Sequence, residues 1–543
     1  VGSNNWVIAG EHTSTGLPML ANDPHLGIQM PAIWYQIGLH APTYEVVGMS
    51  FAGTPGVVIG HNSRIAWGVT NVSPDVRDIY IEKINPDNPD QYQFEGEWLE
   101  ITQIEETIRV NGGEEIVLPV RLTHHGPIIN ELTEGQEEVL SLRWTAQEPN
   151  RILKSIFALN RALTYEEFRE ALRFWDVPSQ NFVYADTRGN IAYQMPGLIP
   201  IRPSSDGLTP VPGWTGEHEW QGWVPYEELP ALLNPEQGYI VTANHAVVDA
   251  DYPYLFTHYW ADGDRGERIE NMVAGAIGNQ RPISHDDIAR MQFDSYSLMA
   301  ETYIPMLEAV QSDEPQGNAA IAELGSWNYQ LRRNSVPAAL FEIFYMQLVR
   351  AVIEDEIGED TYTNLHSTVF MHDLARQPEA AWWDNVSTEN VETHEEILLE
   401  AVAETVRWFE ENQGGEMSDW TWGSIHTATF VSQPLGQSGI DQIEQLVNLG
   451  PLPADGGNAI VNANGWSWSN PASVRGHVSM RLIIDMANFD ANRAVIPTGQ
   501  SGHPTHPNYA SMNPLCLNGQ NYPLLWSRDA IKENATDTLF LSP

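Results

Sequence analysis

The stretch that decides the fold stands at residues 1–10, VGSNNWVIAG. A Gly-Ser step and an Asn pair precede a short apolar run at residues 6–9, which is typical of a buried strand. No initiating Met and no leader-like segment stand before it, so we interpret the stretch as the cut edge of a longer chain. On this interpretation Ser3 lies where a cleavage could expose it.

The composition is that of a large globular protein with an acidic surface. The chain has 543 residues, 42% of them hydrophobic, with dispersed Gly and Pro, which excludes disordered and low-complexity classes. No run approaches the roughly 18 apolar residues of a membrane-spanning helix. A net charge of -45, from 72 acidic and 27 basic residues, repels nucleic acid and anionic membranes, so we expect neither as a partner. A single cysteine, Cys516, excludes an intrachain disulfide.

Periodicity divides the chain into three parts. Strand patterns bounded by turn residues recur through residues 1–264, and NGGEE at 111–115 marks a hairpin turn. Apolar residues at three- and four-residue spacing make 265–420 mainly helical. Capping boxes are expected at Ser284, Thr393 and Thr164. Strand patterns return in 421–543, so the residues predict a sheet-based core with a helical insertion.

The chemistry open to Ser3 depends on a base. A Ser hydroxyl is a weak nucleophile, and the α-amine of a chain terminus is one base that can activate it. Cleavage of the Gly2–Ser3 bond would give Ser3 such an amine, with an unperturbed pKa of about 7.7 to 8.0. From the residues alone, an ordinary Ser ahead of a strand is the commoner interpretation.

Nine blocks, in order along the chain, carry a family resemblance. They are SNNWVIAG, ANDPHLG, GMSFAGTPGVVIGHNSRIAWGVTN, NFVYAD, PVPG, GYIVTANH, DRGERI, SMRLIIDM and PTGQSGHP. Together they resemble the β subunit of the penicillin acylase family, which belongs to the N-terminal nucleophile hydrolases. The resemblance implies an α+β fold with a four-layer αββα core and a large helical insertion. It also implies a precursor that cleaves itself between Gly and Ser, and an α subunit as a separate chain. Because Val1 and Gly2 are still present, we expect the chain as written to be inactive or immature.

The resemblance places the reacting groups on these blocks. Ser3 falls on the nucleophile, and His25 of ANDPHLG falls on a position that hydrogen-bonds around it and tunes its basicity. A tetrahedral oxyanion needs two N–H donors. The family pattern implies the backbone N–H of Val72 and the side-chain amide of Asn244 for that role.

Two assignments around this set are open. Arg265 of DRGERI matches the Arg that orients Asn244, and Arg268 is the alternative if the register slips. The sequence does not show which carboxylate, if any, orients His25, and Asp485 is too loosely aligned to assign.

The residues that match the family's acyl pocket are aliphatic here. They are Leu26, Val58, Ile59 and Val69. An aliphatic wall gains about 0.8 kcal/mol per buried methylene, which favours straight acyl chains such as those of medium-chain penicillins or N-acyl-homoserine lactones. From the residues alone the same four would be assigned to the core, which is compatible with lining a pocket.

A structural calcium ion is an open expectation. Asp75 and Asp78 in SPDVRDIY match family carboxylates that bind Ca²⁺, and the carbonyls of Arg77 and Gly207 are possible additions. A further family aspartate falls on Tyr254, and solvated loop acids would explain the pair equally well. Catalysis itself needs no cofactor.

The resulting expectation is an amidohydrolase that converts an N-acyl amide to a carboxylic acid and an amine through an acyl-enzyme on Ser3. Its partners are the α subunit from the same precursor and a small acyl amide, and the family habit favours a periplasmic or secreted location. One rival is a processing-deficient member that acts as a binding or scaffold protein. Another is an esterase with GMSFA at 48–52 as its elbow, although that motif needs a helix directly after the Ser. The His pairs at 124–125 and 503–506 lack a metal-hydrolase frame.

Overall fold

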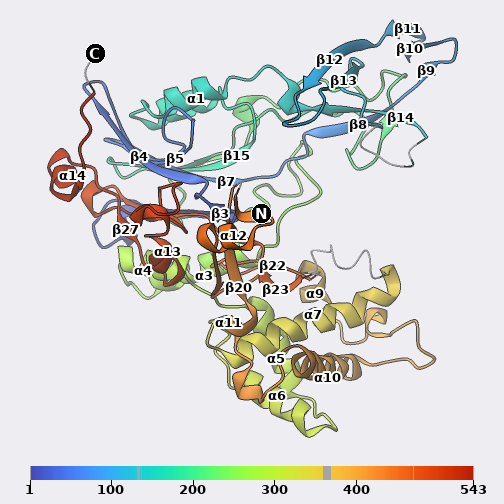
Figure 1. The fold of residues 1–543 in the computed structure, drawn as a ribbon, viewed down its shortest axis with the longest axis vertical. Helices are drawn as coiled ribbons and strands as arrows, with labels where there is room; N and C mark the ends of the chain where they lie inside the picture. Colours follow the sequence, from blue (N-terminus) through green and yellow to red (C-terminus); the bar gives the residue numbers. More distant parts are fainter. Residues whose placement is uncertain are drawn as a thin grey trace.

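Two large β-sheets form the centre of the molecule. The computed structural model describes residues 2–130, 135, 137–358, 368–433, 435–468 and 470–541. The first sheet has seven strands, with β24 paired to β2 beside the main order. That order is β19 (Tyr239–Thr242), β1 (Gly2–Ile8), β2 (Met19–Gly27), β25 (Arg481–Asp485), β26 (Arg493–Val495) and β27 (Tyr522–Pro523), and β24 covers Gly476–Val478. The expected mixture of α and β structure is confirmed (Figure 1).

The second sheet also has seven strands and packs against the first. Its order is β18 (Ala231–Leu233), β16 (Ile191–Gln194), β15 (Gln180–Asp186), β7 (Ile65–Asn71), β6 (Ile59–Asn62), β5 (Tyr44–Phe51) and β4 (Trp34–Ala41). Strands β1 and β2 contact β7 across the interface. A side chain at Gly68 would lie 2.9 Å from Asn22 and 3.2 Å from Leu20, so this glycine allows the close approach of β7 to β2.

Helices cover the outer face of each sheet. Helices α1 (Ile152–Leu159) and α2 (Tyr165–Leu172) pack on the second sheet, where the Phe168 ring meets Phe182 and Tyr184 of β15. Helices α3 (Asp264–Gly278) and α4 (His285–Gln292) pack on the first sheet, in a cluster with Trp6 and Ile8. Figure 1 shows α1 on one side of the sheets and α3 and α4 on the other.

A second group of helices builds a core of its own. They are α5 (Leu298–Glu308), α6 (Pro315–Gly325), α7 (Val336–Ile357), α9 (Thr368–Ala375), α10 (His394–Asn412) and α11 (Trp422–Ile425). Helix α7 is long and apolar enough to cross a membrane, but 72% of its most apolar window is buried among the other helices. Capping boxes begin α4 at Ser284 and α10 at Thr393, as the sequence predicts. At α2 the third expected box is incomplete, because Thr164 accepts from the Glu167 N–H but the Glu167 carboxylate accepts from Leu163.

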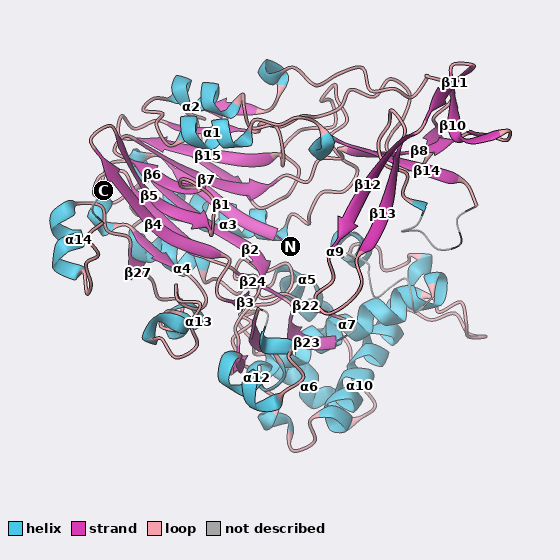
Figure 2. Ribbon diagram, turned by 45° about the horizontal axis from the view of Figure 1, so that its top comes forward, coloured by secondary structure: helices cyan, strands magenta, loops and turns pink. Residues whose placement is uncertain are grey.

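A smaller set of strands extends from one end of the sheets. Sheet β14-β8-β17 joins β8 (Arg77–Glu82), β14 (Val139–Trp144) and β17 (Val211–Pro212), and β12 (Thr102–Ile108) pairs with β13 (Ile116–Leu122). The predicted turn at 111–115 connects this last pair, which Figure 2 shows as a projecting ribbon. The other elements are β3 (Gln29–Met30), β9 (Ile84–Asn85), β10 (Asn88–Phe94), β11 (Glu97–Glu100), β20 (Thr427–Ser432), β21 (Leu449–Pro453), β22 (Trp466–Ser467), β23 (Asn470–Val474), α12 (Asp441–Val447), α13 (Asn513–Leu517) and α14 (Arg528–Asn534).

Candidate active site

The register of β1 brings distant parts of the chain to Ser3. Strand β1 lies between β19 and β2, with Ser3 opposite Pro24 and Asn5 opposite Thr242. Residues 24–25 and the segment after β19 therefore lie on the two sides of Ser3. The Ser3 side chain is buried, and its Oγ donates a 2.5 Å hydrogen bond to the carbonyl of Gly2.

Asn244 and Arg265 hold Ser3 through a chain of hydrogen bonds. The Ser3 N–H donates to Asn244 Oδ1 at 2.7 Å, and Arg265 Nη2 donates to the same oxygen at 2.9 Å. Arg265 Nη1 donates to the Ser3 carbonyl at 2.8 Å. Arg268 instead binds Asp294 at 2.8 Å, so the structure places Arg265 and not Arg268 beside Asn244.

The backbone at Asn244 turns its side chain toward Ser3. Its φ is +70°, in the left-handed region, which Asn adopts more readily than most residues other than Gly. The turn follows directly after the end of β19. Asn244 thus leaves the sheet at the point where its amide can meet β1.

The open edge of β7 receives two asparagine side chains. Strand β6 pairs with β7 only at Ala66 and Trp67. Beyond them, Asn22 accepts from the Val69 N–H at 2.7 Å and donates to the Val69 carbonyl at 3.0 Å. Backbone groups alternate between the two edges of a strand, so those of Asn71 face the same edge as those of Val69. Asn244 Nδ2 donates to the Asn71 carbonyl there, at 2.7 Å.

The alternating direction of the backbone groups along β7 distinguishes two candidate backbone donors for the oxyanion. In a strand, the N–H and C=O of one residue point to the same side, so the Asn71 N–H converges with Asn244 Nδ2. Val72 is buried, but its N–H lies across the trans peptide bond from the Asn71 carbonyl and points the other way. The geometry therefore favours Asn71 over the expected Val72.

His25 belongs to a buried polar network on β1 and β2. Its Nε2 lies 2.9 Å from Asp23 Oδ2, to which Asn4 Nδ2 also donates at 2.8 Å. Asp485 does not fill this role, because it pairs with Met19 at the other end of β2. Asp23 was missed from the sequence, although side chains two apart on a strand share a face.

Burial sets the protonation of this network. Burial raises the pKa of Asp23 to about 8, although Arg481 and hydrogen bonding from Asn4 oppose it. Burial also lowers the pKa of His25 well below its usual range, with Arg265 acting in the same direction. At neutral pH a neutral Asp23 therefore faces a neutral His25, and the contact is a hydrogen bond and not an ion pair.

Gly2 lies within the same cluster. A Cβ at this residue would lie 3.0 Å from Arg265 Nη2 and 3.3 Å from both Asn244 Oδ1 and His25 Nδ1. These distances are shorter than ordinary Cβ contacts, so a side chain at this residue would force its neighbours to move. The groups that surround Ser3 therefore also enclose the residue before it.

The four residues expected in the acyl pocket belong to, or pack against, the hydrophobic core between the two large sheets. Ile59 is fully buried, Val58 and Val69 nearly so, and Leu26 is half-buried. The Val58 carbonyl accepts from Trp67 Nε1 at 2.9 Å. Leu26 follows His25 on β2, pairs with His477 of β24 and is the most exposed of the four residues.

The two acids expected to bind calcium contact a guanidinium. Arg202 Nε donates to both oxygens of Asp78, at 2.8 and 3.1 Å, and Arg202 Nη2 lies 3.5 Å from Asp75 Oδ1. Trp220 Nε1 also donates to Asp78. Arg202 is buried and already supplies the positive charge, so the residues present do not fit a calcium ion.

The remaining calcium candidates add no carboxylate. A Cβ at Gly207 would lie 2.2 Å from Asp75 Oδ2, so this backbone approaches the acid closely. The Tyr254 hydroxyl donates to Glu228 and not to either acid. Arg77 pairs with Trp144 of β14, and its N–H donates to Asp75 Oδ1 at 3.3 Å.

The esterase interpretation of GMSFA is wrong. Ser50 lies near the end of β5, and its hydroxyl binds the carbonyls of Phe51 and Thr54. The chain then turns into β6. A nucleophile elbow requires a helix directly after the Ser, whereas here a turn segment and then strand β6 follow.

Comparisons with known proteins agree with this architecture. The chain matches the Penicillin amidase family model over residues 1–533. It is 30% identical over 564 residues to the acyl-homoserine lactone acylase QuiP of Pseudomonas aeruginosa, covering 95% of this chain and 66% of that protein. It is 31% identical over 566 residues to the penicillin acylase 2 proenzyme of Pseudomonas sp. strain SE83, covering 100% and 69%.

A solved structure shares the fold. The thermostable penicillin G acylase from Alcaligenes faecalis superposes with a TM-score of 0.74 at 24% identity, over 99% of both chains. The chain spans just under two thirds of the length of the QuiP protein. Because the family match extends over nearly all of the sequence, the protein belongs to the penicillin amidase family of N-terminal nucleophile hydrolases.

Proposed function

We propose that the protein is an amidohydrolase that cleaves N-acyl amides through an acyl-enzyme on Ser3. The observation that carries this proposal is the buried chain from Arg265 through Asn244 to the Ser3 nitrogen. This chain of hydrogen bonds brings together the Ser3 hydroxyl, the Ser3 backbone nitrogen and the side-chain amide of Asn244. Those are the parts that a nucleophile with a built-in base requires.

Cleavage of the Gly2–Ser3 bond starts the proposed sequence. It converts the Ser3 nitrogen into an α-amine that stays beside Asn244 Oδ1. Arg265 is buried and its pKa is lowered by burial to about 10, so it remains charged at neutral pH. That charge favours the neutral amine, which can accept the proton of Ser3 Oγ as the hydroxyl attacks the substrate carbonyl.

Two N–H donors stabilise the oxyanion in this proposal. Asn244 Nδ2 carries a second hydrogen beyond the one given to the Asn71 carbonyl, and the Asn71 N–H points to the same side. The amine product then leaves, and water hydrolyses the acyl-enzyme. His25, Asp23 and Asn4 act as positioning residues, since Asn4 Oδ1 accepts from Arg265 at 2.6 Å.

We also propose an aliphatic acyl group as the substrate's recognition element. The relatives named above act on acyl-homoserine lactones and penicillins, by their descriptions. Leu26, Val58, Ile59 and Val69 would supply an apolar wall without aromatic rings. An α subunit from the same precursor would complete the pocket, and the periplasm or the exterior is the proposed location.

The test uses the complete precursor with Ser3→Ala and, as the matched control, Ser50→Ala. Ser50 is the buried Ser of the rejected elbow. We expect Ser3→Ala to block both cleavage, measured by intact mass and N-terminal sequencing, and amide hydrolysis. Ser50→Ala should retain both. Normal processing or turnover in Ser3→Ala would remove Ser3 from the mechanism.

The acyl preference needs a second measurement. We expect kcat/KM to rise with each methylene across a series of straight-chain acyl amides until the pocket ends. Leu26→Phe should move the optimum to shorter chains, because the ring fills the accessible end of the wall. A preference for arylacetyl amides over the whole series would contradict the aliphatic proposal but not the role of Ser3.

A further inference from the structure

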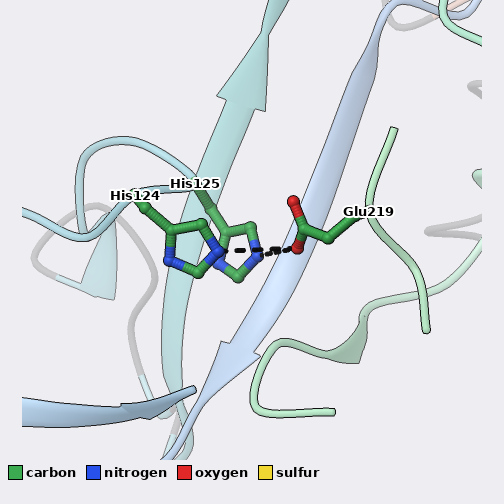
Figure 3. A group of neighbouring side chains, drawn as sticks. All are labelled: His124, His125 and Glu219. Carbon is green, nitrogen blue, oxygen red and sulfur yellow. Dashed lines mark hydrogen bonds and ion pairs between the residues drawn. The ribbon is translucent and has the colours of Figure 1, made fainter. Parts of the chain in front are cut away.

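We propose that His124, His125 and Glu219 form a binding site for a zinc ion, separate from the site at Ser3. Both histidines lie in the turn after β13, and Glu219 comes from the segment before Trp220. One ligand atom from each residue lies within 4.8 Å of the other two. Figure 3 shows both imidazole rings directed at the same carboxylate oxygen.

The separations of the ligand atoms suit a metal ion. Glu219 Oε1 lies 2.6 Å from His125 Nε2 and 3.5 Å from His124 Nε2. Zinc binds imidazole nitrogen at about 2.0 to 2.1 Å, so its tetrahedral ligands lie roughly 3.3 Å apart. A small outward movement of Glu219 from His125 would therefore admit the ion.

Outer hydrogen bonds orient both rings. His125 Nδ1 lies 2.8 Å from Glu82 Oε1, and that carboxylate is itself held by Thr123 Oγ1 at 2.7 Å and Ser141 Oγ at 2.6 Å. The Nδ1 of His124 lies 3.0 Å from the Tyr92 hydroxyl. Such partners at Nδ1 leave Nε2 as the metal-binding atom, as in many zinc sites.

The charge around the cluster favours a cation. Glu82 and Glu219 supply two carboxylates, and Arg143 supplies a guanidinium, which donates to Glu219 Oε2 at 3.2 Å. Glu82 Oε2 is buried without a hydrogen-bond partner among the described residues. In the metal-free state, a protonated His125 between Glu82 and Glu219 would balance this charge.

Zinc fits this donor set better than calcium or magnesium does. Two imidazole nitrogens and one carboxylate oxygen suit a borderline-soft ion, whereas Ca²⁺ and Mg²⁺ prefer oxygen ligands throughout. The side chains of His124 and Glu219 are 29% and 28% exposed, so water can reach a fourth position. The ion would link the base of the β12–β13 ribbon to the segment that contains Glu219.

The test measures zinc bound to the complete protein by elemental analysis and by competition with a chromophoric chelator. We expect one zinc per chain. His124→Asn and Glu219→Gln should each lose the bound ion, and Tyr92→Phe should weaken it about 10- to 100-fold through His124. A Co²⁺-loaded sample should show the visible absorption of a four-coordinate site.

A matched control uses the other His pair. His503 and His506 are exposed, and their contacts include Thr505 and Asn508. The double variant His503→Asn/His506→Asn should keep one zinc per chain. Loss of zinc in this control, retention in both His124→Asn and Glu219→Gln, or no zinc in the native protein would overturn the proposal in favour of a protonated His125.

Discussion

Asn244 is the residue on which the proposed chemistry depends most. Its Oδ1 accepts from the Ser3 nitrogen and Arg265, which leaves Nδ2 to point at the β7 edge. The left-handed backbone makes this orientation possible. In the proposed mechanism, one side chain thus positions the base and supplies an oxyanion donor.

We expect Asn244→Ala to lower kcat by about 10² to 10³, the usual effect of losing one oxyanion donor. Asn234→Ala is the control, because Asn234 also has a left-handed φ, of +48°, but lies outside the site. Steady-state kinetics on one acyl amide compares the two. A kcat for Asn244→Ala within a few-fold of the control would place the oxyanion elsewhere.

Single residues also show what a sequence can predict. Ser3, Asn244 and Arg265 meet as the motif blocks imply. Asp23 could have been found from the two-residue period of β2, since it lies two positions before His25. The choice between Asn71 and Val72 depends on the phase of β7, which only the contacts of Asn22 with Val69 reveal.

At the scale of the element, helix α7 carries an acid inside an apolar core. Glu342 is buried, and Trp466 Nε1 donates to it at 2.8 Å. Burial raises the pKa of Glu342 from 4.5 to about 7. The folded protein therefore holds a proton on Glu342 at a pH where the unfolded chain has released it.

This difference makes stability depend on pH in a defined direction. Because the pKa of Glu342 is raised in the folded protein, its contribution to the free energy of unfolding is complete below pH 4.5. That contribution is lost as the pH rises from 4.5 through about 7. The loss amounts to roughly 3 kcal/mol for this group. We expect Glu342→Gln to gain thermal stability over the wild type at pH 8 but not at pH 4.5.

Thermal unfolding at the two pH values checks this expectation. Glu356→Gln, on the exposed end of the same helix, should leave the wild-type pH dependence intact. An unchanged pH dependence in Glu342→Gln would show that Glu342 is ionised in the folded protein.

Strand β8 carries an acid, Asp78, whose partner the sequence does not disclose. Asp78 meets Arg202 from 124 residues further along the chain. We expect removal of calcium with EGTA to leave the melting temperature unchanged. Arg202→Met should destabilise the fold by about 3 to 5 kcal/mol, because Asp78 is then buried without its positively charged partner.

Calorimetry with and without added calcium measures both effects. Arg77→Met, an exposed neighbour in the same segment, is the control and should behave as the wild type. A melting temperature that EGTA lowers and calcium restores would show that the ion binds despite Arg202.

At the scale of the whole molecule, the sequence predicted the local structure better than it predicted the contacts between distant parts of the chain. The strand-rich parts, the helical stretch and the hairpin at 111–115 follow from periodicity and turn residues. Within the stretch 265–420, however, α3 and α4 pack on the first sheet, whereas α5 and the helices after it form a separate core. Periodicity identifies an apolar face but not the surface that covers it.

The close packing around Gly2 has a consequence for the evolution of this sequence. Three side chains that the proposed mechanism uses, those of Arg265, Asn244 and His25, lie so close to Gly2 that a Cβ at this residue would displace them. Under the proposed self-cleavage, that residue departs before the first turnover. A mutation of Gly2 would leave the mature chain chemically identical, but it would lower the yield of that chain. Selection would therefore act on a residue that the mature chain no longer contains.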